Sequence, residues 1–238
     1  MKYLLLWLEA PLQSWGADSR FDFRKTMDAP TKSGLYGLLL AASGDSGPQE
    51  ELLAQMADAP LSVVVFDGFT PRLTDFHMVG NGYDQSDKWE RLNIPLTPAK
   101  SIAVNGGARV TYREYLQDRC FAAVLGLPDA LADKFASALQ SPVFDLYLGR
   151  KCCAPTDFIF RGVFASESDA FNALQKLITE KNLVPRFIFT DAQLQEEESF
   201  LVNDIPVRFG QHRLYRDRWV VKRDWTAVLE SMVPLCSH

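Results

Sequence analysis

Apolar residues in the first third of the chain fall into four blocks, and the spacing within each block predicts one element. Residues 2–8 form an apolar run rich in Leu, and residues 61–66 (LSVVVF) are rich in β-branched Val, which predicts two buried strands. Residues 34–42 predict an apolar helix. Residues 48–58 carry apolar side chains at helical spacing and predict a second helix, with Ser46 as its cap.

The same kinds of block return after a long polar interval. Residues 120–127 predict a third strand, residues 128–139 an amphipathic helix with proline in its first turn, and residues 158–164 a fourth strand. The interval at 67–119 is rich in Gly, Asn, Asp and Pro and is too long for a plain loop. Alternating polar and apolar residues at 109–115 indicate strand structure within it.

This order of elements predicts an α+β fold. We expect a ferredoxin-like, RRM-like domain over residues 1–165, with a long thumb-like hairpin inserted at about 67–119. Residues 166–238 predict a small, β-rich C-terminal extension with one helix at 167–179. RNA-recognition modules use such an architecture, but a fold of this kind hosts many functions, so the function has to come from particular residues.

The charged residues are distributed unevenly along the chain, and this affects which binding functions the sequence allows. The formal net charge of −5 argues against a general nucleic-acid binder, which depends on many lysines and arginines. Residues 205–223 nevertheless carry six Lys or Arg against one Asp, while residues 192–204 carry only acidic charges. A local basic surface is therefore expected on a protein that is acidic on average.

The sequence predicts a protein of the cytoplasm that uses no cofactor, no metal and no membrane. Glu9 interrupts the first apolar run before it reaches signal-peptide length, and no other run approaches the roughly 18 apolar residues of a membrane span. The four cysteines show no CxxC spacing, so neither a zinc site nor a redox dithiol is indicated. Acidic pairs such as Asp18 and Asp22 lack the spacing of metal ligands.

The start of the first helix is a candidate phosphate site. Thr31, Lys32 and Ser33 lie where the free backbone N–H groups of a helix point outward, and Arg20 and Arg24 precede them. A hydroxyl at this place has an alternative role as an ordinary helix cap. A Walker A loop is excluded, because the positions that would need glycine hold threonine, and a nucleoside triphosphatase is therefore not expected.

Four sequence motifs in order resemble the CasD family, the RAMP-type subunits of the type I-E CRISPR Cascade complex. They are LEAPLQSWG at 8–16, PTKSGLYGLLLAASG at 30–44, YREYLQDRCF at 112–121 and YLGRKCCAP at 147–155. The last third is similar only loosely, mainly through the basic residues 211–223. The resemblance implies a ferredoxin-like domain with a thumb that caps one end of the Cascade backbone and holds the 5′ handle of the CRISPR RNA. The implied partners are that RNA, the backbone subunits and the large subunit, with target DNA contacted through the complex.

A single-stranded handle would be held by cations and N–H groups at its phosphates and by aromatic faces at its bases. Each candidate has a plainer alternative: Trp15 as a core residue, Arg113 with Glu114 as a solvated strand face, and residues 211–223 as a contact for an acidic neighbour. The expected RNA-binding residues are Trp15, Arg20, Arg24, Lys32 and Ser33 on one wall, Arg109, Tyr112 and Arg113 on another, and Arg150 and Lys151 closing the site.

No catalytic residues are predicted. A metal-independent endoribonuclease that processes precursor RNA is the alternative, and it needs a general base and a general acid. His77, His212 and His238 are the only histidines, and no paired acid and base stands out beside them. A pure scaffold without RNA contact is a third possibility, which the cations and hydroxyls at 20–33 disfavour.

Overall fold

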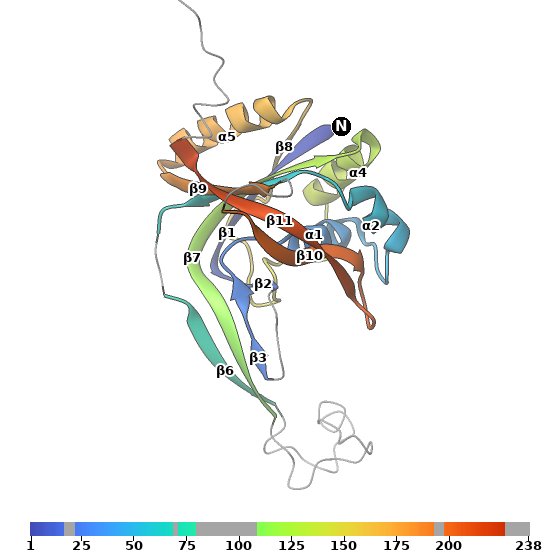
Figure 1. Ribbon diagram of the computed structural model, residues 1–238, viewed down its shortest axis with the longest axis vertical. Coiled ribbons are helices and arrows are strands. Elements are labelled where there is room, and N and C mark those ends of the chain that lie inside the picture. Colours follow the sequence, from blue (N-terminus) through green and yellow to red (C-terminus); the bar gives the residue numbers. More distant parts are fainter. Residues whose placement is uncertain (17–21, 69–70, 80–108, 193–197, 227–238) are drawn as a thin grey trace, which may run out of the picture.

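The structure is a computed structural model that describes residues 1–16, 22–68, 71–79, 109–192 and 198–226. Its frame is a large antiparallel sheet (Figure 1). In spatial order its strands are β10 (Phe200–Arg208), β11 (Leu214–Asp224), β9 (Pro185–Asp191), β5 (Leu61–Phe66), β7 (Arg109–Leu127), β1 (Lys2–Gln13) and β8 (Phe160–Phe164).

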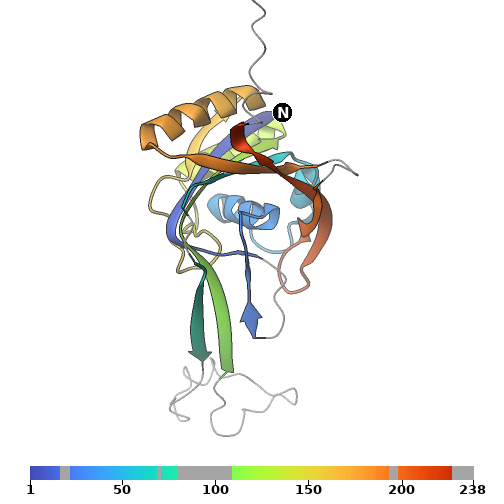
Figure 2. The ribbon, with the colours of Figure 1, turned by 60° about the vertical axis from the view of Figure 1, so that its left-hand side comes forward.

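Helices cover both faces of this sheet. Figure 2 shows α1 (Lys32–Ser43) and α5 (Glu167–Lys181) on opposite sides of it. The alternation of β1 explains why, since Leu4, Leu6 and Leu8 pack in one core cluster with α1 and with α4 (Asp129–Gln140). Leu5 and Trp7 point the other way and pack in a second cluster with α5. The protein is therefore a mixed α and β structure, as the sequence predicts.

The first helix forms where the sequence predicts it, because both of its ends are capped. The Thr31 hydroxyl accepts a hydrogen bond from the N–H of Gly34 at 3.2 Å. Gly44 ends the helix in the left-handed conformation, with φ of 76°. The predicted helix at 128–139 is also confirmed, as is the strand at 61–66.

Two local predictions are wrong. The second helix, α2 (Glu50–Met56), is shorter than predicted, and Ser46 does not cap it. Gln49 takes the N-cap position with φ of 56°, and its side chain donates to the Ser46 carbonyl at 2.7 Å. The third strand does not begin at residue 120, because β7 is one strand of 19 residues that enters the predicted insertion.

The outer half of β7 carries two further strands away from the core. β6 (Leu73–Val79) pairs with it antiparallel, and β3 (Phe23–Arg24) pairs with it parallel. This three-stranded ribbon, called the ribbon below, projects from the body of the protein in Figure 1. The remainder of the predicted thumb, residues 80–108, lies outside the described residues.

The C-terminal third continues the main sheet, because β9 pairs with β5. The predicted division at residues 1–165 and 166–238, and the thumb limits at 67–119, stay predictions. A small second sheet joins β2 (Trp15–Gly16) to β4 (Thr26–Met27), next to the start of α1. None of the helices among the described residues has the length and apolar character needed to cross a membrane.

Candidate nucleic-acid interface

The ribbon presents two chemically different faces. Across its three strands Phe23 pairs with Tyr112 and Tyr112 with Phe76, while Arg24 pairs with Arg113 and Arg113 with Asp75. Residues that are directly opposite in paired strands point to the same side of a sheet. One face therefore carries a row of three aromatic rings, and the other carries two arginines beside one aspartate.

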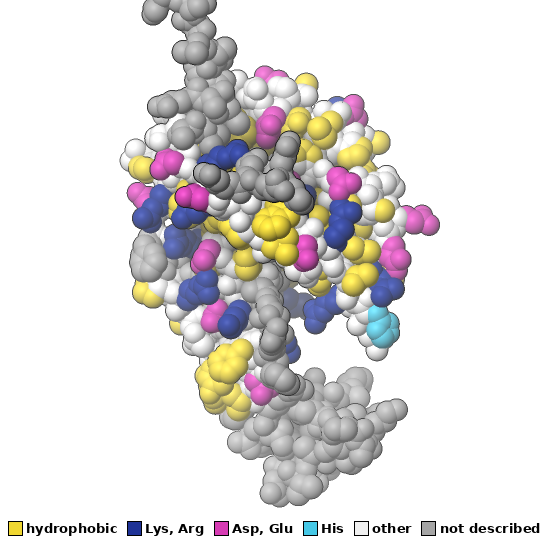
Figure 3. Space-filling view, viewed as in Figure 1, with side chains coloured by type: hydrophobic (Ala, Val, Ile, Leu, Met, Phe, Trp, Pro, Cys, Tyr) yellow, Lys and Arg dark blue, Asp and Glu magenta, His cyan; other side chains and the backbone are white. Residues whose placement is uncertain are grey.

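The aromatic row is unusually open to solvent. The Phe23 and Tyr112 rings stack, with centroids 4.8 Å apart and planes 13° apart, and Phe76 meets Tyr112 edge-on at 5.7 Å. Phe23 is 52% exposed and Phe76 is 56% exposed. Figure 3 shows a hydrophobic patch on the projecting ribbon. Ring faces held in this way can stack on unpaired bases of any identity.

Arg150 fixes the ribbon to the body of the protein. Its guanidinium donates to the Glu114 carbonyl at 3.1 Å and to the Arg24 carbonyl at 2.9 Å, and it lies 4.6 Å from the centre of the Tyr115 ring. The neighbouring Lys151 is exposed. The structure thus brings four predicted residues together, Arg24, Tyr112, Arg113 and Arg150, with Lys151 next in the chain.

A carboxylate of the protein lies at the start of α1, where the sequence predicts a phosphate site. The backbone N–H of Lys32 donates to Asp204 Oδ2 at 2.7 Å, and Lys32 Nζ lies 3.3 Å from Asp191 Oδ2. The side chain of Lys32 is buried, and this burial lowers its pKa although Asp191 opposes the shift. Ser33 is half-buried, with Oγ 3.3 Å from Thr31 Oγ1.

Arg218 completes this buried network of charges. It donates to Asp204 through Nε at 2.7 Å and Nη2 at 2.9 Å, and to Asp191 through Nη1 at 2.6 Å. Burial opposes the charge of Arg218, but the hydrogen bonds to Asp204 raise its pKa above the usual value. The network joins β9, β10 and β11 to the start of α1.

Trp15, which the sequence offers as a stacking platform or as a core residue, lies in the core of this structure. It is 1% exposed, and its indole N–H donates to Gln13 Oε1 at 3.1 Å. A methyl group added at Gly34 would lie 2.7 Å from Trp15 Cε3, so the ring packs directly on α1. A base could reach it only if it left the core.

The remaining predicted residues divide into two groups. Arg20 and the side chain of Arg109 lie outside the described part of the chain. In the basic C-terminal segment, Arg216 pairs with Asp58 at 2.6 Å, and Arg218 belongs to the buried network. Acidic groups of the same protein therefore occupy part of the positive charge that the sequence offers to a partner.

Sequence reasoning missed Phe23 and Phe76. The signal was present for Phe23, because aromatic and charged residues alternate in RFDFR at 20–24, but it was weak for Phe76, which is the one aromatic residue of TDFH at 74–77. Alternation of this kind predicts a strand with one aromatic face. The sequence of either segment alone, however, does not indicate which strand it pairs with.

The histidines form no evident catalytic set. In β6, the carbonyl of His77 accepts from the Thr111 hydroxyl at 3.4 Å, and its buried Nδ1 has no hydrogen-bond partner among the described residues. His212 is exposed in the turn after β10, and His238 lies outside the described residues. Within the described ranges, no group of three His, Cys, Asp or Glu side chains could hold a metal ion.

Comparison with known proteins gives concordant similarities. The model of the family described as CRISPR-associated protein (Cas_Cas5) matches residues 3–221. The CRISPR system Cascade subunit CasD of Escherichia coli strain K12 is 30% identical over 184 residues, which cover 72% of this chain and 75% of that protein. A chain of a solved CRISPR RNA-guided surveillance complex is 26% identical with a TM-score of 0.72, covering 93% of this chain and 89% of that one. A crystal structure of a Cas protein is also 26% identical, with a TM-score of 0.60 over 93% of this chain and 94% of the other.

Proposed function

The chain belongs to the CRISPR-associated Cas5 family, and from this we propose that it is the CasD-type subunit of a Cascade surveillance complex. In that complex it binds the 5′ handle of the CRISPR RNA and contacts the backbone and large subunits. Target DNA is reached through the assembled complex, in the cytoplasm. The exposed aromatic row of the ribbon is the observation that carries the RNA-binding part of the proposal.

The finer architecture is part of the same proposal. We infer that β1, β5, β7 and β8 with helices α1 and α4 form a ferredoxin-like domain. The support is the spatial order β5-β7-β1-β8, in which all neighbouring strands are antiparallel. Each helix then connects two strands that have one other strand between them, which is the arrangement of a split βαβ unit. The ribbon is the described base of the thumb.

The two faces of the ribbon suit two parts of one nucleotide strand. Unpaired bases stack on Phe23, Tyr112 and Phe76, and phosphates meet Arg24 and Arg113 where the strand bends around the ribbon. Stacking is tolerant of sequence, whereas the cations set the salt dependence of binding. Substitution of each kind of residue therefore produces a different signature.

We expect Phe76→Ala and Phe23→Ala each to weaken binding of handle RNA by about 1–3 kcal/mol with little change in the salt dependence. Arg113→Ala should instead lower the slope of log K against log salt by about 0.7, since it removes one phosphate contact. Fluorescence anisotropy over a series of salt concentrations measures both quantities.

Phe158→Ala is the matched control for the aromatic row. Phe158 is 81% exposed, lies in the loop before β8, and makes no ring contact with Phe23, Tyr112 or Phe76 among the described residues. Its loss should leave RNA affinity unchanged. Equal effects of Phe76→Ala and Phe158→Ala in folded protein would refute a specific role for the row.

We further propose that the chain is not an enzyme. The His77→Ala protein should bind handle RNA and support guide maturation like the wild type, because His77 stands opposite Thr111 and no general acid is paired with it in the described part of the chain. Cleavage is measured by denaturing gel electrophoresis of repeat RNA that has been incubated with the purified chain in EDTA, and no cleavage is expected. Cleavage at one position that disappears in His77→Ala would establish the endoribonuclease instead.

A further inference from the structure

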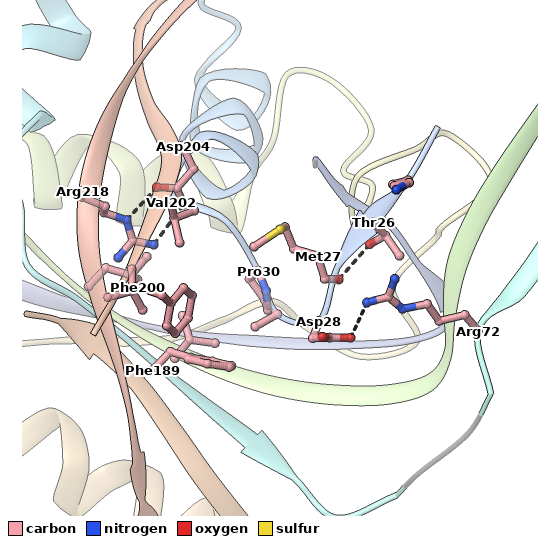
Figure 4. A pocket seen from close by; sticks show the side chains of 15 residues that line it. Thr26, Met27, Asp28, Pro30, Arg72, Phe189, Phe200, Val202, Asp204 and Arg218 are labelled. Carbon is pink, nitrogen blue, oxygen red and sulfur yellow. Dashed lines mark hydrogen bonds and ion pairs between the residues drawn. The ribbon is translucent and has the colours of Figure 1, made fainter. Parts of the chain in front are cut away.

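A cavity of about 400 Å³ lies at the base of the ribbon, between the segment 25–30 and the surface of the main sheet. This cavity, called the slot below, is shown in Figure 4. Its volume lies in the usual range of sites for small ligands, about 300–1,000 Å³. Its lining residues come from the segment before α1, from β5, β9, β10 and β11, and from Arg72 just before β6.

The slot has apolar walls and polar ends. Phe189 and Phe200 stand on one side in Figure 4, and Met27 and Pro30 on the other. The two phenylalanine rings meet edge-on, with centroids 6.1 Å apart. The Arg218–Asp204 pair lies at one end and the Arg72–Asp28 pair at the other. A nucleobase has the complementary form, with flat apolar faces and polar edges.

A cation is available at the rim for the phosphate of such a nucleotide. Arg72 is shared between Asp28 at 2.6 Å and Glu114 at 3.2 Å, so its charge is already balanced. Lys25 also lines the slot, is exposed, and has no ion pair within the described residues. The charge of Lys25 at the rim favours a nucleotide over an uncharged aromatic side chain.

The slot is continuous with the aromatic face of the ribbon. Lys25 directly follows β3, Arg72 directly precedes β6, and Arg72 reaches Glu114 on β7. Glu114 lies two residues from Tyr112 and therefore on the same face, at a rise of about 7 Å along the strand. A strand stacked on the aromatic row thus passes the mouth of the slot.

We propose that the slot holds one base of the same RNA strand, as a site separate from the aromatic row. The proposal rests on the proposed function. It adds a second kind of binding position, at which one base is enclosed in the slot, while other bases stack on the exposed aromatic row. An enclosed base contributes to affinity through its own faces, so deleting that base alone should weaken binding. Filling the slot should have the same consequence.

The test combines abasic scanning of the RNA with variants of the full chain. Handle RNA is synthesised with one base at a time replaced by an abasic site, which keeps every phosphate. With wild-type protein, we expect deletion at the slot position to weaken binding about 5- to 150-fold. Ala29→Phe places a ring in the slot and should abolish this penalty at one position only. Ala130→Phe, on the exposed start of α4, is the control and should leave the profile unchanged.

Phe200→Ala provides a second variant that does not depend on accommodating extra volume. Phe200 is partly exposed, and its removal opens one wall of the slot, so the penalty at the same position should shrink. An abasic profile unchanged in both variants overturns the slot proposal. If the abasic profile is unchanged but the variants no longer co-purify with a protein subunit, the slot binds a protein side chain, and this result also overturns the proposal. Wild-type protein that binds no handle RNA defeats the proposed function itself, which keeps the two failures distinct.

Discussion

Replacing Asp204 with alanine should lower the free energy of unfolding by about 3–5 kcal/mol, one of the largest effects of any single substitution in this protein. Asp204 is 2% exposed and accepts three hydrogen bonds, two from Arg218 and one from the backbone N–H of Lys32. Its removal leaves a buried guanidinium with one carboxylate fewer and leaves the start of α1 without its acceptor. Each of these groups then pays its desolvation cost with less compensation.

Asp58→Ala is the matched control, because Asp58 also receives an arginine of β11 but at an exposed position. The Arg216–Asp58 pair has a separation of 2.6 Å, yet both side chains are largely in water. Its loss should cost no more than about 1 kcal/mol. Urea denaturation of the two variants measures the difference directly. Equal midpoints for Asp204→Ala and Asp58→Ala would mean that the buried network contributes no more than a surface pair.

Local sequence signals predicted the elements that build the core. The apolar run at 61–66 became β5, which is buried throughout, because a strand covered on both faces needs no polar positions. The first helix followed from its apolar residues, and the contacts that cap its ends, at Thr31 and Gly44, lie within a few residues of the helix. Information of this kind lies within one short segment, so it can be read before the fold is known.

The functional surface could not be predicted in the same way, because it depends on register between distant segments. Phe23 and Tyr112 are neighbours only because β3 pairs with the outer half of β7. The same limit applies to the start of α1. The start of α1 does attract an anion, as the sequence indicates, but the anion is Asp204, which lies 172 residues further along the chain.

The sequence motif at 147–155 identified the segment of Arg150 and Lys151, but it did not indicate how this segment is held in place. Gly149 has φ of 104°, and a methyl group added there would lie 1.7 Å from the Ser14 carbonyl oxygen. The backbones at Ser14 and Gly149 cannot easily move apart, because the N–H of Ser14 donates to the Leu148 carbonyl at 3.1 Å. The close approach holds the next residue, Arg150, where its guanidinium reaches Glu114 and Arg24.

Gly149→Ala should therefore damage both stability and RNA binding. The strained backbone conformation costs about 1–3 kcal/mol, and displacement of the Ser14 backbone adds about 1–3 kcal/mol. Once Arg150 is displaced, the Arg24 carbonyl loses its hydrogen bond from the guanidinium. The pairing of β3 with β7, which places Phe23 against Tyr112, is then less well supported from the body of the protein. Handle RNA should then bind more weakly than it does to the Phe23→Ala protein, because the arginine face is disturbed as well.

Gly47→Ala separates the cost of backbone strain from the cost of the contact with Ser14, since Gly47 has φ of 87° but no atom within 4 Å of the added methyl group. It should show the backbone cost alone and keep full RNA affinity in the same melting and anisotropy measurements. If Gly149→Ala matches Gly47→Ala in both, the contact with Ser14 does not position Arg150.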